Sequence, residues 1–457
     1  MNTMNTLKKI FFAGLLLVPI ITTTNQASNN DMWVTIFAHG SFSLRPHLNI
    51  GNILKMLNDS IEESIYYRST EINRRDPFFY KNQAMGDLGL QRINLDKPNN
   101  TLAAPTVAIA FEQVSQIAGN KPCNQYYTFG WSGLVSNKLR YIEASFLYSE
   151  LQKLVKELKK QGYNPKIRLL GYSHGGNLGL QLGAIHQTKN KDDQVYIDEF
   201  HLLGTPIQVE TDYLITSPIF KRIYNWYSDA DNVQTLDFFS FKRFFSKKRF
   251  SKRKNFNLPD KLTQIKLKVS DYIPKKLAKN LEEIPKNRKD LKRYFKEINY
   301  DPGHFELWFM GWTILTYRQK FPTNPLPIMT FIPLITKYIN DDPKLSRDLI
   351  AYIQPRFETV ELTAYKASKH IHSSRRPFVA EEILNEMRKY ALQFVPDNYN
   401  IETYNRKVYD AINIVQHELK KIEQLTRKER KKNSTKQIVN LHLPENKYEG
   451  HLPSKPI

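Results

Sequence analysis

The sequence predicts an α/β protein in which a mostly parallel sheet carries helices on both faces. Short apolar, strand-like segments alternate with longer helix-like segments along the first half of the chain. The segments at 126–130 and 166–171 are joined by a long stretch with apolar residues at intervals of three and four, which ends near Gly162. A strand–helix–strand unit with such a long connection favours parallel pairing. The apolar helix positions are Ile142, Phe146, Leu147, Leu151, Leu154, Val155 and Leu158.

Further strands and helices follow from local patterns. The expected strands comprise 33–38, 126–130, 166–171, 199–203, 223–228 and 263–269. The last of these alternates apolar and basic residues, which is typical of an edge strand that closes a sheet. Amphipathic patterns at 383–394 and 408–422 predict two helices, and therefore a helical extension over 323–432 followed by a polar tail at 433–457. Residues 43–104 show no regular pattern and are expected to cross the mouth of the site.

The central motif is Gly171-Tyr172-Ser173-His174-Gly175, which lies between a predicted strand and a predicted helix. Glycines on both sides of a serine permit a tight, strained turn that lifts the hydroxyl above the end of a sheet. The helix continues with Gly179 and Gly183, a spacing that lets its axis approach the sheet closely. The alternative interpretation is an ordinary glycine-containing loop that happens to include a serine.

Other motifs occur in a fixed order around this turn. His39-Gly40-Ser41 ends the first strand, and Gly204-Thr205-Pro206 ends a later one. With the serine turn, they make the stretch 33–311 resemble the α/β-hydrolases, in their lipase and esterase branch. The resemblance implies an α/β-hydrolase fold over 31–322 with a basic insertion at 238–299. It also implies an oxyanion hole formed by the backbone N–H groups of His174 and of Ser41, or of the neighbouring Phe42.

A serine hydroxyl needs a basic partner and an acidic residue to orient that base. The chain order in α/β-hydrolases is serine, acid, histidine, which this chain matches with Ser173, Asp231 and His304. His304 lies in an Asp-Pro-Gly-His turn after the last plausible strand, whereas other histidines fall within predicted helices, strands or the tail. Asp229 is the alternative acid, because it lies in the same loop after a strand.

These residues predict a serine hydrolase that cleaves a carboxylic ester, preferably of a lipid, through an acyl-enzyme on Ser173. Acyl transfer to an alcohol is an alternative that the residues do not distinguish. A second alternative is a non-catalytic basic binding protein that uses the fold as a scaffold. No metal-binding spacing and no phosphate-binding glycine loop occurs in the sequence, so no cofactor is expected.

The ends and the charge of the chain suggest where it acts. Lys8 and Lys9 precede a 12-residue apolar run, which predicts a signal peptide over 1–28 and an exported protein; an uncleaved anchor is the alternative. The 457-residue chain has a formal charge of +22, and residues 240–299 hold 20 Lys and Arg against 6 Asp and Glu. Phenylalanines interleave with these cations, as at Phe250, which favours an anionic membrane surface as partner. A solvated insertion is the alternative, and nucleic acid is not the expected partner.

Overall fold

The computed structural model describes residues 30–41, 83–98, 103–119, 124–134, 136–233, 246–270, 300–311, 320–365, 372–393 and 424. Several predicted features lie outside these residues: the signal peptide at 1–28, the helix at 408–422, the tail at 433–457 and the phenylalanines of the basic insertion that precede residue 246.

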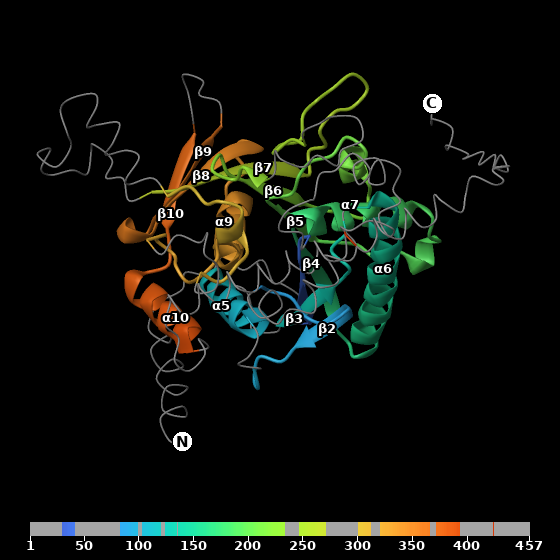
Figure 1. The fold of residues 1–457 in the computed structure, drawn as a ribbon, viewed down its shortest axis with the longest axis horizontal. Coiled ribbons are helices and arrows are strands. Elements are labelled where there is room, and N and C mark those ends of the chain that lie inside the picture. Colours follow the sequence, from blue (N-terminus) through green and yellow to red (C-terminus); the bar gives the residue numbers. More distant parts are fainter. Residues whose placement is uncertain are drawn as a thin grey trace, which may run out of the picture.

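The described residues form one ten-stranded sheet in the order β10-β9-β8-β7-β6-β5-β4-β1-β3-β2 (Figure 1). The strands from β8 to β3 in this order pair in parallel, whereas β2, β9 and β10 pair antiparallel at the two edges. The strands are β1 (Asp31–Ala38), β2 (Gly89–Ile93), β3 (Asn124–Gly130), β4 (Asn164–Tyr172), β5 (Glu199–Leu203), β6 (Ile223–Tyr227), β7 (Leu262–Val269), β8 (Asp348–Gln354), β9 (Thr359–Ala364) and β10 (Ser373–Pro377).

Helices cover both faces of the sheet, and each face has its own apolar core. On one face lie α6 (Asn137–Lys160) and α7 (His174–Gln187). On the other lie α5 (Ala103–Ile117), α9 (Ile332–Asp341) and α10 (Glu381–Gln393) (Figure 1). The predicted α/β class, with a mostly parallel sheet between helical layers, is therefore confirmed.

The buried stripe of α6 differs from the predicted one. The helix spans the expected residues, but the side chain of Phe146 is 62% exposed and that of Ile142 is exposed as well. Ala144 and Tyr148 occupy the buried face instead, together with Leu147 and Leu151. The pattern misassigned the face because it ranked large apolar side chains above a small one that permits close packing.

Strand β7 is not the edge strand that its alternating pattern suggested. It lies between β6 and β8 and pairs with both in parallel. Its lysines do not protect a free edge, because Lys266 forms an ion pair with Asp229, and Lys268 lies 3.5 Å from the carboxylate of Asp301. A lysine that alternates with apolar residues therefore marks a polar face here rather than an edge.

The C-terminal region corrects a second expectation. Within the range predicted as a helical extension, β8, β9 and β10 continue the sheet from β7, and only α9 and α10 are helices of eight residues or more in the described part. The predicted amphipathic face of α10 is present, since Leu384, Met387 and Ala391 are buried. Two elements near the N-terminus were not predicted: β2, which lies within the stretch expected to be irregular, and α5.

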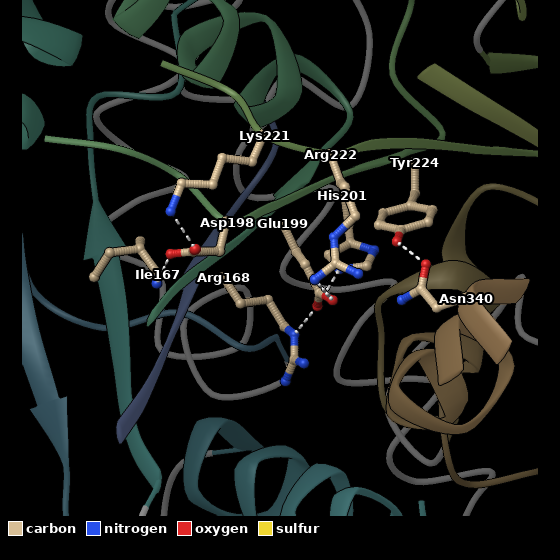
Figure 2. A network of polar contacts seen from close by, with 9 residues as sticks. All are labelled: Ile167, Arg168, Asp198, Glu199, His201, Lys221, Arg222, Tyr224 and Asn340. Carbon is tan, nitrogen blue, oxygen red and sulfur yellow. Dashed lines mark hydrogen bonds and ion pairs between the residues drawn. The ribbon is translucent and has the colours of Figure 1, made fainter. Parts of the chain in front are cut away.

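A buried ionic cluster lies at the end of the sheet opposite Ser173 (Figure 2). The carboxylate of Glu199, at the start of β5, lies 2.7 Å from Arg168 Nε and 3.2 Å from Arg222 Nη2. His201 lies 3.5 Å from the same carboxylate, and its Nδ1 accepts a hydrogen bond from Trp226 Nε1. Burial raises the pKa of Glu199, but Arg168, His201 and Arg222 more than offset this, so the net pKa is lowered.

We expect this cluster to lower the free energy of unfolding as the pH falls below neutral. Burial lowers the pKa of His201, and together with Arg168 and Arg222 it outweighs the opposing effect of Glu199, so the net pKa is lowered as well. The unfolded chain therefore takes up protons below about pH 6.5 at histidine and below about pH 4.5 at glutamate, before the folded protein does. Both groups thus stabilise the fold at neutral pH and lose that contribution as the pH falls. Urea unfolding midpoints measured from pH 7 to pH 5 should decrease, and His201→Gln should flatten the decrease. An unchanged slope in the variant would exclude this role.

Candidate active site

Ser173 occupies the strained turn between β4 and α7. Its φ is 50° and its ψ is −126°, a conformation that non-glycine residues rarely adopt. The turn closes tightly because Gly171 and Gly175, two residues before and after Ser173, lack side chains. A Cβ on Gly171 would lie 2.7 Å from the backbone of Gly176. A Cβ on Gly175 would overlap the backbone at Ala38, the last residue of β1, and at His39 after it.

The glycine stripe of α7 produces the close approach to the sheet that its spacing predicts. A Cβ on Gly179 would lie 2.6 Å from the ring of Phe200 in β5, and one on Gly183 would lie 3.0 Å from the carbonyl of Leu214. The start of α7 lies close to the carboxyl ends of β1 and β5, because a Cβ on Gly175 would meet Ala38 and one on Gly176 would meet Leu202. Ser173 immediately precedes the helix.

His304 and Asp231 form a hydrogen-bonded pair. His304 Nδ1 donates to Asp231 Oδ2 at 2.8 Å, and the backbone N–H of Val233 donates to the other carboxylate oxygen at 3.1 Å. The side chain of Asp231 is completely buried, whereas that of Asp229 is 58% exposed and pairs with Lys266. Of the two acids left open by the sequence, the structure brings Asp231 to the histidine.

The His304–Asp231 pair lies beside the serine turn. The ring of Tyr172, the residue before Ser173, is 4.8 Å from the imidazole of His304, and its hydroxyl donates to the His304 carbonyl at 3.1 Å. The Ser173 N–H donates to Leu203, and a Cβ on the adjoining Gly204 would lie 2.9 Å from Asp231 Oδ2 and 3.1 Å from His304 Nδ1. Burial raises the pKa of Tyr172, with Asp231 and Glu306 adding to it, so the hydroxyl remains a donor.

The loop predicted to supply the first oxyanion donor lies against the serine. A Cβ on Gly40 would lie 2.8 Å from the Cβ of Ser173. His39 fixes the Gly40 peptide: its Nε2 accepts from the Trp131 N–H at 3.2 Å, so its Nδ1 carries the proton and donates to the Gly40 carbonyl at 2.7 Å. In a trans peptide the N–H points away from the carbonyl, so this bond also sets the direction of the Ser41 N–H.

The sequence interpretation gave Trp131 no catalytic role, but its side chain contacts His39 and holds this loop in place. Its indole N–H donates to the His39 carbonyl at 2.8 Å, and its ring stacks on the imidazole. The sequence shows Trp131 directly after the predicted strand at 126–130, but a local pattern does not identify its partner in space.

His174, the other predicted oxyanion residue, follows Ser173 at the start of α7 and is held by a buried arginine. Arg140 Nη1 donates to His174 Nδ1 at 2.7 Å, while its Nη2 donates to Gln208 Oε1 at 2.9 Å. Sequence patterns missed Arg140 because it lies in the first turn of α6, before the apolar positions that marked the predicted helix, and an arginine in a helix is usually exposed. Its guanidinium fixes the imidazole beside the serine and leaves Nε2 as the protonated nitrogen.

Gly204 gives a direct test of how tightly the site is packed. For the ester hydrolysis that the sequence predicts, we expect Gly204→Ala to lower kcat/KM on a short-chain ester by about 100-fold, because the methyl group must displace the His304–Asp231 pair. Strain at its φ of +57° should also lower the free energy of unfolding by about 1–2 kcal/mol.

Gly162→Ala is the matched control for this variant. Gly162 has a φ of +85°, but a Cβ there would meet nothing within 4 Å. It should therefore show a similar loss of stability with unchanged kcat/KM. Equal activity losses in the two variants would mean that backbone strain, and not overlap with the pair, causes the effect.

No protein-family model matches the chain, and no curated protein matches its sequence significantly. Among the residues that the structure describes, no helix is both long and apolar enough to cross a membrane. The same residues contain no group of three or more His, Cys, Asp or Glu side chains arranged to hold a metal ion.

Proposed function

We propose that the protein is an exported serine hydrolase of the α/β-hydrolase fold that cleaves a carboxylic ester, with lipid esters preferred. The observation that carries this proposal is the strained Ser173 turn beside the buried His304–Asp231 hydrogen bond. A positive φ at a non-glycine residue is costly and persists where the conformation has a use. The order of β4, the turn and α7 supports the same assignment.

In the proposed reaction, Ser173 Oγ attacks the acyl carbon while His304 Nε2 accepts its proton. Asp231 holds His304 Nδ1–H and stabilises the imidazolium that forms. His304 then returns the proton to the departing alkoxide, which leaves as an alcohol. Water attacks the acyl-enzyme by the same route and releases the acid, or a second alcohol takes the acyl group in the transferase alternative.

The negative oxygen of each tetrahedral intermediate is proposed to face the N–H groups of His174 and Ser41. The orientation of the Gly40–Ser41 peptide by His39, and the packing of Gly40 on Ser173, support this placement. A donor of this kind typically contributes about 10²–10³ to the rate. Arg140 and Trp131 would act through the residues they position.

The proposed preference for lipids rests on the basic charge of 238–299, but the described part of that segment changes the argument. Phe250 is buried in the core, so it is not available to enter a membrane. Arg249 and Arg253 form ion pairs with Asp348 and Asp212. Contact with an anionic surface would therefore depend on the remaining exposed cations and on residues outside the described part.

A fluorophosphonate probe tests the proposal, because it phosphonylates only an activated serine. The wild-type protein should be labelled, and Ser173→Ala should not. Ser132→Ala is the control, since its hydroxyl hydrogen-bonds to Glu143 and lies outside the proposed chemistry; it should label like the wild type. A folded wild-type protein that does not react would favour the non-catalytic binder instead.

A further inference from the structure

A cavity lies apart from the serine site. It has a volume of about 860 Å³ and opens between the segment 246–260 and the beginnings of β7 and β8. None of Ser173, Asp231 and His304 lines it. Its polar lining is strongly cationic, with five cations against two carboxylates: Lys247, Lys248, Arg249, Lys252 and Arg347 against Asp260 and Asp348.

Two of these cations, Arg249 and Lys248, already interact with other groups of the protein. Arg249 pairs with Asp348, and its guanidinium stacks over the ring of Tyr365. Lys248 Nζ donates to the carbonyls of Ser228 and Asp229, in the loop that carries Asp231. These two residues build the wall of the cavity and connect it to the acid loop of the active site.

The other three cations are available to a ligand. Lys247, Lys252 and Arg347 are exposed, and within the described residues none of them forms an ion pair with a carboxylate. Lys247 Nζ donates a hydrogen bond to the hydroxyl of Ser251, which does not neutralise its charge. Three like charges around one cavity repel one another, so an anion that binds among them gains attraction and relieves that repulsion.

The remaining lining residues indicate the kind of anion. Ser246, Ser251 and Gln264 offer hydrogen-bonding groups, while Phe250, Leu258, Pro259 and Leu262 provide apolar surface. A phosphate group matches several ammonium and guanidinium donors at once. The volume exceeds what one phosphate ion needs, and the apolar wall suits an organic substituent. We propose that this cavity binds a phosphate ester, with the phosphate among Lys247, Lys252 and Arg347.

The site is tested with two probes, inorganic phosphate and monomeric dihexanoyl phosphatidic acid, each titrated calorimetrically at fixed ionic strength. All proteins carry Ser173→Ala, so no ester is cleaved and the outcome does not depend on the proposed hydrolase activity. The test variant adds Lys247→Gln, Lys252→Gln and Arg347→Gln. The control adds Lys156→Gln, Lys159→Gln and Lys160→Gln, which remove the same charge from the exposed side of α6.

We expect the cavity variant to weaken dihexanoyl phosphatidic acid binding by about 10-fold to 100-fold, and the α6 variant to change it less than about threefold. Tighter binding of the lipid than of inorganic phosphate, lost in the cavity variant, would support a phosphate ester as the ligand. Equal binding of both probes would show that the cavity binds free phosphate and would overturn the proposed role of the organic substituent. The proposal is overturned if the parent protein binds neither probe, or if the two charge variants weaken binding equally, because the effect would then come from net charge alone.

Discussion

Asp231→Asn should lower kcat/KM for p-nitrophenyl butyrate by about 10⁴-fold while leaving the protein folded. The amide has nearly the same shape as the carboxylate, but it carries no charge to stabilise the imidazolium of His304. Its NH₂ group can also displace the Nδ1 proton from the hydrogen bond, which leaves Nε2 protonated and unable to accept from Ser173. The loss should appear in kcat more than in KM, because the charge of Asp231 is needed most when the imidazolium of His304 forms during the reaction.

Asp229→Asn is the control two residues away. Asp229 is mostly exposed and pairs with Lys266, not with a histidine. We expect it to retain kcat/KM within about threefold, as is usual for an exposed ion pair. If Asp229→Asn lost as much activity as Asp231→Asn, or if Asp231→Asn retained a tenth of the wild-type activity, the assignment of the acid would be wrong.

Glu199→Ala should have the largest effect on stability, lowering the free energy of unfolding by about 3–5 kcal/mol. The substitution leaves Arg168 buried without its carboxylate, and His201 loses the acceptor nearest its Nε2. The stacking of Arg168 over the ring of Trp33 does not replace that charge. Urea denaturation followed by tryptophan fluorescence measures the change.

Glu361→Ala is the corresponding surface control. Glu361 pairs with Arg375 across β9 and β10 at 3.1 Å, where both side chains are about one-third exposed or more. Its loss should cost about 0–1 kcal/mol. Similar values for the two glutamates would show that the Glu199 cluster is no more important for stability than a solvent-exposed pair.

Local sequence patterns were sufficient for the parts of the fold that depend on neighbours in the chain. Strands β1, β3, β4, β5 and β6 lie where short apolar runs predicted them, because parallel strands buried on both faces carry apolar residues almost continuously. The serine turn was recognisable for a related reason. Its close packing requires glycine two residues before and two residues after Ser173, so five consecutive residues are enough to recognise it.

Patterns failed where the partner of a residue is distant in the chain. The lysines of β7 suggested an edge strand, but Asp229, Asp301 and the β8 strand at 348–354 place that strand inside the sheet. Likewise, no local pattern pointed to Arg140, because its contacts with His174 and Gln208 span 34 and 68 residues. Long-range pairing has no local signature.

The candidate site divides in the same way. By itself, the sequence determined that a strained serine follows a buried strand, and that an acid and a histidine follow it in order. Only the tertiary structure decided between Asp231 and Asp229, because both lie in one loop and differ in what surrounds them: one is enclosed beside His304, and the other extends to solvent and Lys266. Burial and distance depend on how β6, β7 and the His304 turn come together, and no window of the sequence contains all three.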